Sequence, residues 1–87
     1  LNNNFLAIST GQEIKLIDIS NLNNPKKIPK SIKISNILHS IIDIDKNTFA
    51  IVERDKQIIL VNKSKYPVKY SSITINNNIE VVAKLIP

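Results

Sequence analysis

The sequence predicts an all-β domain, and three observations support that prediction. Ile and Val, whose β-branched side chains favour extended backbone, are dense along the 87 residues. Short apolar runs alternate with polar turn residues at regular intervals. A hydrophobic content of 43% with 22% charged residues is typical of a globular protein, and 87 residues allow only one small domain. No apolar stretch approaches the roughly 20 residues of a membrane-spanning helix, so no membrane span is predicted.

Eight strands are predicted, and each is bounded by residues that favour turns. In chain order the strands span residues 5–10, 13–19, 28–34, 38–44, 48–53, 57–62, 68–75 and 79–86. The turns between them fall where Gly, Pro, Asn and Asp gather, at 10–12, 20–25, 45–47, 54–56, 66–67 and 76–78. The segment 37–42 also fits the apolar face of a helix that begins at Ser35 or Asn36. A strand is the preferred interpretation of this segment.

The first half of the chain is repeated in the second half. A shift of 44 residues places Phe5 on Phe49 and the stretch 13–18 on 57–62. The same shift places Gly11 on Asp55, and both residue types tolerate the unusual backbone of a tight turn. Further along, a shift of 41 residues places Ile32 and Ile34 on Ile73 and Ile75. The chain is therefore predicted to contain two copies of one structural unit.

A period of about 40 to 45 residues with four strands per unit is typical of a β-propeller blade. On this interpretation residues 1–34 form a partial blade, which supplies its second, third and fourth strands. Residues 37–76 form a complete blade, and residues 78–87 form the first strand of a following blade. The chain would then be a fragment cut within a blade at both ends, as a first residue other than Met also suggests.

The stretch 13–28 resembles the LVIVD repeat, in which an apolar strand ends in Asp and is followed by an aliphatic residue, Ser-Asn and a Pro. The matching residues are Ile14, Leu16, Ile17, Asp18, Ser20, Asn21 and Pro25. The second copy, 57–70, matches less well because Asn62 replaces the Asp and Lys65 replaces the Asn. The resemblance implies a propeller of the kind found largely in bacterial and archaeal surface or exported proteins, without an assigned catalytic activity. A WD-repeat propeller is the second choice, since the Gly-His and Trp-Asp dipeptides of that family are missing.

The net charge of +5 does not by itself predict binding to nucleic acid. The chain has 18 Ile, 12 Asn and 11 Lys, the residues with the most A- and T-rich codons, which indicates an AT-rich genome. The lysines are scattered along the chain. Base stacking needs exposed aromatic residues among cations, and only Tyr66 and Tyr70, near Lys63, Lys65 and Lys69, provide that pattern. Nucleic acid is therefore an improbable partner.

No catalytic, metal-binding or cofactor-binding residue is predicted. Asp43 and Asp45 begin like a calcium loop, but Thr48 stands where the loop needs Gly and Arg54 where it needs Glu, so a hairpin turn is expected. The chain has no Cys, and its one Gly excludes a glycine-rich phosphate loop.

The one histidine, His39, has no nucleophile partner in a recognisable motif. Its neighbour Ser40 is expected on the opposite face of the strand. A structural polar role is therefore expected for His39.

The predicted function is a non-catalytic propeller segment that acts as a protein-interaction or surface-binding scaffold. Possible partner contacts are Asn36, His39, Asp55 and Tyr66, because propellers bind at loops and at the mouth of the channel. The partners would be a protein and further blades, either of the same chain or of other copies. Exposed apolar blade faces predict that the isolated chain aggregates, self-associates or stays partly unfolded.

Two alternatives remain open. One is a short lectin-like propeller assembled from several chains, against which the absence of Trp for sugar stacking counts. The other is a piece of a larger propeller enzyme. An extracytoplasmic or cell-surface location is favoured only by the repeat resemblance.

Overall fold

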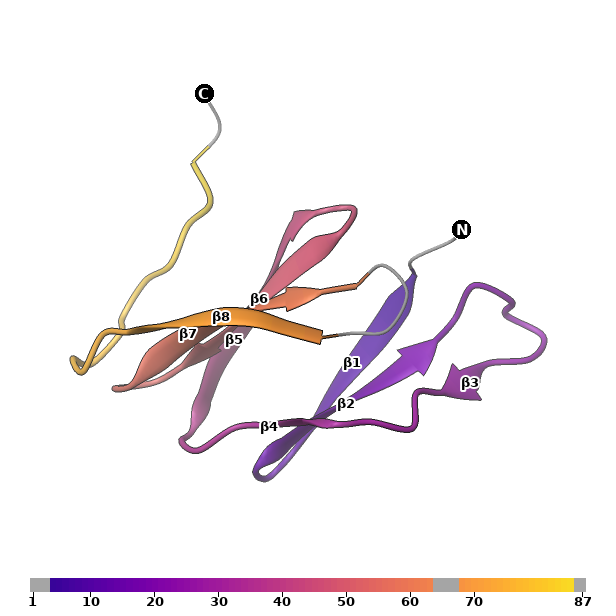
Figure 1. Ribbon diagram of the computed structural model, residues 1–87, viewed down its shortest axis with the longest axis horizontal. Coiled ribbons are helices and arrows are strands. Elements are labelled where there is room, and N and C mark those ends of the chain that lie inside the picture. The colour runs from indigo at the N-terminus through magenta and orange to yellow at the C-terminus, as the bar shows by residue number, and fades with distance from the viewer. Residues whose placement is uncertain (1–3, 64–67, 86–87) are drawn as a thin grey trace.

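All the regular structure in the described part of the chain is β-sheet, as the sequence predicts. The computed structural model describes residues 4–63 and 68–85 (Figure 1). Its strands, in chain order, are β1 (Phe5–Thr10), β2 (Glu13–Asp18), β3 (Lys26–Lys27), β4 (Ile32–Lys33), β5 (Leu38–Asp45), β6 (Thr48–Glu53), β7 (Gln57–Asn62) and β8 (Val68–Thr74).

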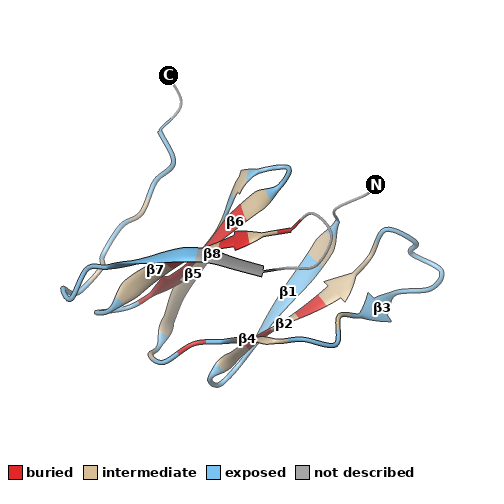
Figure 2. Cartoon of the chain, in the orientation of Figure 1, coloured by how far each residue is buried: buried red, intermediate tan, exposed pale blue. Residues whose placement is uncertain are grey.

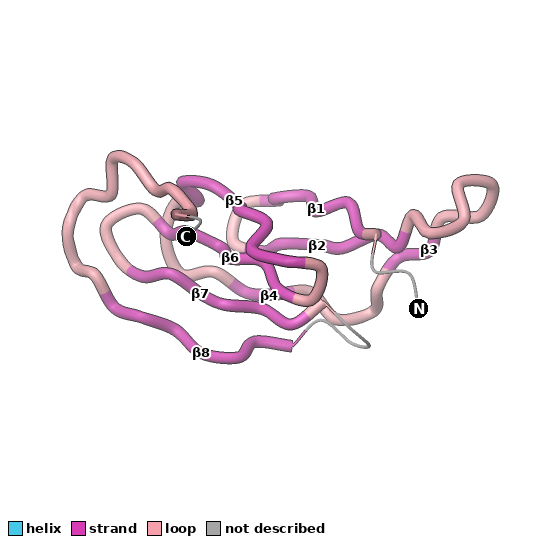
Figure 3. The backbone as a smooth tube through the Cα atoms, turned by 90° about the horizontal axis from the view of Figure 1, so that it is seen from above, coloured by secondary structure: helices cyan, strands magenta, loops and turns pink. Residues whose placement is uncertain are grey.

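The strands form two antiparallel sheets that are not closed into a barrel. Sheet A contains β1 to β4, with β1 paired to β2, and both β3 and β4 paired to the other edge of β2. Sheet B is a meander in the order β5-β6-β7-β8. Figure 3, seen from above, shows only strands and loops along the described residues. The hairpins β1–β2, β5–β6 and β6–β7 are each joined by a turn of two or three residues, which is the simplest antiparallel connection.

Three strands have the predicted bounds because an apolar run there lies between two strong turn signals. They are β1, β6 and β7. The segment 37–42, which also fits a helical face, lies in β5 from residue 38 onward, so the strand interpretation is confirmed. A strand forms at this position because β6 supplies ladder partners for β5 from Leu38 to Asp45.

The predicted strand 28–34 is wrong as a continuous element. Two short strands, β3 and β4, stand at its ends, and residues 28–31 between them belong to neither. Pro29 lies in the gap, and a proline has no N–H to donate to a ladder, so it interrupts an edge strand. The Ile28 N–H still donates to the Leu16 carbonyl at 2.9 Å, which keeps the interrupted edge against β2.

The predicted strand 79–86 is also wrong for its described part, residues 79–85, which form no ladder. This segment runs beside β5 and contacts it through side chains. The His39 ring Nε2 lies 3.0 Å from the Glu80 carbonyl, and Lys84 Nζ donates to the Ile44 carbonyl. A strand needs backbone-to-backbone hydrogen bonds, and each of these two contacts joins a side chain to a backbone carbonyl.

The hydrophobic core lies between the two sheets. Its buried residues are Ile14, Leu16 and Ile34 from sheet A and the β4–β5 connection, and Phe49, Ile51, Ile59 and Val61 from sheet B. Figure 2 shows the buried positions concentrated where the sheets face each other. Because side chains alternate along a strand, each sheet has one face on this core, here called its inner face, and one outer face. Within the described residues there is no helix, and thus none that could cross a membrane.

Candidate interaction site

Four connections gather at one end of the sheets, here called the turn end. They are the β1–β2 turn at 11–12, the β4–β5 connection at 34–37, the β6–β7 turn at 54–56 and the segment 75–78 after β8. Backbone hydrogen bonds link them: Ile34 N donates to Gln12 O at 2.9 Å, and Ile75 N donates to Lys56 O at 2.7 Å. The turn end is therefore a connected surface rather than a set of separate loops.

Ile37 is an exposed apolar side chain on a backbone that is held at both ends. Its N–H donates to the Asn36 Oδ1 at 2.7 Å, and its carbonyl accepts from the Arg54 N–H at 2.8 Å. The residue remains 63% exposed. A rigid, exposed hydrophobic side chain costs little conformational entropy when a partner covers it, so it suits a binding contact.

Glu53 connects the segments of the turn end through hydrogen bonds of its buried side chain. It is fully buried at the end of β6. Its Oε1 accepts hydrogen bonds from the N–H and hydroxyl of Ser35, at 3.2 and 3.1 Å, and its Oε2 accepts from Gln57 Nε2 at 2.8 Å. A buried carboxylate is tolerated when its oxygens are hydrogen-bonded in this way. Glu53 thus ties the connection between the two sheets to both strands of the β6–β7 hairpin.

Two of the four predicted contacts, Asn36 and Asp55, lie at the turn end. Asp55 is exposed and adopts a positive φ of 64°, as the turn prediction requires, and Gly11 in the β1–β2 turn has a φ of 68°. Asn36 caps the backbone of Ile37 with its side-chain oxygen. The bond from the Arg54 N–H to the Ile37 carbonyl brings these two segments together. Of the other two predicted contacts, Tyr66 lies outside the described residues.

His39, the remaining predicted contact, is used to hold the segment 78–85. The expectation that Ser40 points away from it is wrong, because the His39 Nδ1 lies 2.8 Å from the Ser40 Oγ. A register shift between Leu38 and Ser40 breaks the alternation of side chains there, as a β-bulge does. The Glu80 carbonyl can only accept, so the His39 Nε2 carries a proton and donates to it.

The carboxylates Asp18 and Asp45 cap turns. The Asp18 Oδ1 accepts from the Ser20 N–H at 2.9 Å, and the Asp45 Oδ1 accepts from the Asn47 N–H at 2.7 Å. The hydrogen bonds from Ser20 lower the pKa of Asp18, and the backbone hydrogen bond from Asn47 lowers the pKa of Asp45. The predicted hairpin turn after β5 is confirmed, with Asp45 paired to Thr48 across it.

Two further carboxylates pair with side chains of neighbouring strands. The exposed Asp43 accepts from the buried Lys63 Nζ at 2.8 Å. Glu13 accepts from the Ser31 hydroxyl, and this hydrogen bond lowers its pKa, assisted by the nearby Lys33 charge. Lys63 is therefore paired within the fold. It is one of the three lysines that were considered as a possible contact with nucleic acid. Among residues 4–63 and 68–85 there is no group of three or more His, Asp and Glu side chains that could hold a metal ion.

The sequence analysis missed Ile37 and Glu53. The sequence places Ile37 between the predicted strands 28–34 and 38–44, but its exposure on a hydrogen-bonded backbone is visible only in the fold. Glu53 ends an apolar strand, where a charged residue is usually solvated. Its two partners at i−18 and i+4 become visible only in the fold. In the sequence, the only indication of this network was a Gln four residues after the acidic end of the strand.

Comparison with known proteins adds no further identification. No protein-family model matches the chain, and neither a curated protein nor a solved structure matches it significantly.

Proposed function

We propose that this chain is a segment of a β-propeller that acts as a non-catalytic scaffold, with the turn end as its protein-binding surface. The observation that carries the proposal is Ile37, which is fixed by two backbone hydrogen bonds and is nevertheless 63% exposed. It is flanked by Asn36, Arg54 and Asp55, which supply polar and charged groups at the rim. An apolar centre with a polar rim is the usual composition of a protein–protein contact.

The two sheets follow one plan, which supports a repeat. In sheet A, Ile14 pairs with Ile32, and in sheet B, Ile58 pairs with Ile73. These pairs are related by the shifts of 44 and 41 residues found in the sequence. The bonds from Ile34 N to Gln12 O and from Ile75 N to Lys56 O obey the same shifts.

The ladders correct one detail of the sequence repeat. The sequence places Phe5 on Phe49, but Phe49 pairs with Val61 in sheet B, and the residue that pairs with Ile17 in sheet A is Leu6. The shift between β1 and β6 is therefore 43 residues rather than 44. The cause is the connecting turn, which has two residues between Thr10 and Glu13 and three between Glu53 and Gln57.

The acidic side chains support a role without catalysis. Five of the seven acidic residues of the chain are occupied by turn caps, the Lys63 pair or the sheet connections described above. The resemblance of 13–28 to LVIVD repeats favours a setting at the cell surface or outside the cytoplasm. In that setting the scaffold would present its turn end to another protein.

Photo-crosslinking tests this proposal. A photoreactive phenylalanine analogue would replace Ile37 in the protein expressed in its own cells, and adducts would be identified by mass spectrometry. The matched control carries the analogue at Leu22, which is 79% exposed in the β2–β3 connection, away from the turn end. We expect one specific protein adduct at position 37 and none at position 22. That adduct should be lost when Arg54→Ala and Asp55→Ala are added.

Equal adducts at both positions, or none at position 37, would contradict the proposal. Turnover of a substrate by the purified chain would contradict its non-catalytic part.

A further inference from the structure

The outer face of sheet A is the counterpart of a face that sheet B buries. With the shift of 43 residues for β1, Leu6 and Ile8 correspond to Phe49 and Ile51. Phe49 and Ile51 are 4% and 0% exposed because sheet A covers them, whereas Leu6 and Ile8 are 51% and 38% exposed. The corresponding apolar surface is thus covered in sheet B and exposed to water in sheet A.

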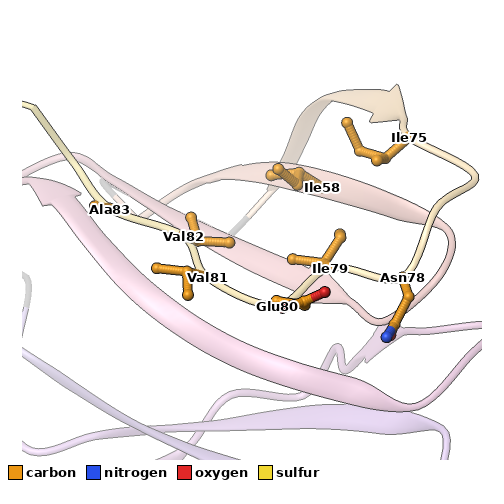
Figure 4. A pocket seen from close by; sticks show the side chains of 8 residues that line it. All are labelled: Ile58, Ile75, Asn78, Ile79, Glu80, Val81, Val82 and Ala83. Atoms are coloured by element: carbon orange, nitrogen blue, oxygen red, sulfur yellow. The ribbon is translucent and has the colours of Figure 1, made fainter.

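The outer face of sheet B is the counterpart of the face that sheet A buries. Ile58, Ile73 and Ile75 correspond to Ile14, Ile32 and Ile34. Ile34 is 4% exposed, but Ile73 and Ile75 are 53% and 37% exposed. In Figure 4 Ile58 and Ile75 face the segment 78–83 across an open cleft of about 560 Å³. The one interface inside the chain therefore has both of its halves repeated on the two outer sides, although Ala50 and Val52, which lie beside Ile58 on the outer face of sheet B, are 4% and 0% exposed.

The backbone edges show the same relation. In sheet B, β5 pairs with β6. In sheet A, the described residues supply no strand on the corresponding edge of β1, which pairs with β2 alone. The segment 79–85, shifted by 41 residues, is the counterpart of β5, and it has no ladder partner among the described residues. An uncharged edge strand and an unpaired extended segment are complementary, since each offers free N–H and C=O groups.

We propose that a second copy of this chain docks its sheet A on the outer face of sheet B, with its β1 paired to the segment 79–85. This inference rests on the proposed repeat architecture and repeats, between chains, the packing seen within one chain. Such a head-to-tail contact is heterologous and builds a ring or an open chain of copies. In sheet B, Ser40 pairs with Val52 and Ile42 with Ala50. With the shifts of 41 residues for β5 and 43 for β6, these pairs predict that Val81 pairs with Ser9 of the second copy, and Ala83 with its Ala7. Ile8 of that copy would enter the cleft beside Ile58.

Lys15 is a charged residue within the docking face, between Glu13 and Ile17 on the same face of β2, and it weakens the contact. It corresponds to Ile59, which is 2% exposed in sheet B, and Lys15 itself is half-buried on the outer face of sheet A. Its aliphatic stem can lie on the apolar surface while the ammonium group reaches the rim. A lysine in place of an isoleucine weakens the contact, so the copies should associate reversibly.

Disulfide trapping tests the predicted register, because the chain has no cysteine of its own. The variants Ser9→Cys and Val81→Cys would be mixed in equal amounts and oxidised mildly. We expect a covalent dimer from this mixture, and no dimer from either variant alone, because a head-to-tail contact never joins two identical positions. A mixture of Ser9→Cys with Leu22→Cys is the matched control and should remain monomeric. Absence of the mixed dimer, or equal dimer from Ser9→Cys alone, would overturn the proposal.

Two further variants test the face itself, with sedimentation velocity as the measurement and circular dichroism to confirm the β fold. Ile8→Lys should raise the dissociation constant of self-association at least tenfold, and Lys15→Ile should lower it at least tenfold. Leu22→Lys should leave it unchanged. A wild-type chain that remains monomeric up to millimolar concentration would contradict the docking. Ile37 is not among the residues of this contact. Absence of self-association with an intact Ile37 adduct would therefore reject this inference alone, and absence of the adduct alone would reject only the scaffold function.

Discussion

The most informative residue of the fold is Glu53, because three hydrogen bonds to one buried carboxylate connect the sheets. Its oxygens accept from Ser35, in the connection that leads from sheet A to sheet B, and from Gln57 in β7. Removal of a buried acceptor leaves its donors unpaired, which costs more than the hydrogen bonds themselves contribute. The geometry of the turn end therefore depends on this side chain.

Glu53→Ala should lower the free energy of unfolding by about 1–3 kcal/mol, because the partly buried hydrogen bonds from Ser35 and Gln57 lose their acceptor. Glu53→Gln should cost about half as much, since a Gln oxygen can still accept from Ser35 and the Gln57 amide can turn to accept from the new NH₂ group. Urea denaturation followed by circular dichroism measures both. Equal stability of wild type and Glu53→Ala would show that the network is not formed in solution.

Acid should destabilise the chain through the turn caps. The pKa values of Asp18 and Asp45 are lowered in the fold by hydrogen bonds from Ser20 and Asn47. A lowered folded-state pKa contributes stability that is fully present above the unfolded pKa, about 3.9 for Asp, and is lost as the pH falls through the folded value. Urea midpoints at pH 7 and pH 3 should differ for wild type, and differ less for the variant Asp18→Asn with Asp45→Asn. An unchanged pH dependence in that variant would assign acid sensitivity to other groups.

At the scale of the elements, the two tight turns determine the register of the hairpins. The β1–β2 turn uses Gly11 at a φ of 68°, and the β6–β7 turn uses Asp55 at 64°. Both lie in the left-handed region, which glycine reaches without steric cost and other residues reach at a cost. The turns differ in length by one residue, and that difference moves Leu6 rather than Phe5 to the position of Phe49.

Gly11→Ala should lower the free energy of unfolding by about 1 kcal/mol, because alanine must adopt the strained φ. A Cβ at this position meets no atom within 4 Å, so the cost is in the backbone and not in packing. Asp55→Gly is the matched control and should be within about 0.5 kcal/mol of wild type or slightly more stable. Thermal or urea unfolding compares the two. A destabilised Asp55→Gly with a neutral Gly11→Ala would contradict the turn assignment.

Strands and turns were predictable where local chemistry decides them. β1, β6 and β7 have their predicted bounds because each is an apolar run between two turn signals, and the hairpin turn after Asp45 forms where the sequence predicts it. The edge of sheet A was not predictable in detail, because the effect of Pro29 depends on which side of the strand faces β2. The bulge that joins His39 to Ser40 and the burial of Glu53 were missed because both follow from partners distant in sequence.

At the scale of the whole molecule, the described residues present two apolar outer faces, an unpaired edge on β1 and the unpaired segment 79–85. Each face corresponds to a face that is buried between the two sheets. The edge of β1 and the segment 79–85 correspond to β6 and β5, which pair with each other. The shift of 44 residues was visible in the sequence. The identity of the outward residues was not, because a one-residue difference in register moves a side chain to the other face of a strand. Under the proposed docking, the two sheets are successive units of a stack that further copies extend on both sides.

Amide hydrogen exchange at increasing protein concentration tests this stack most directly. If the chain associates as proposed, amides of β1 and of residues 79–85 become protected together as the concentration rises, because each provides the other's missing ladder. The amides of β6, which already has partners on both sides, should exchange slowly at every concentration. Exchange in β1 and 79–85 that stays fast and independent of concentration, in a cooperatively folding monomer, would contradict the account.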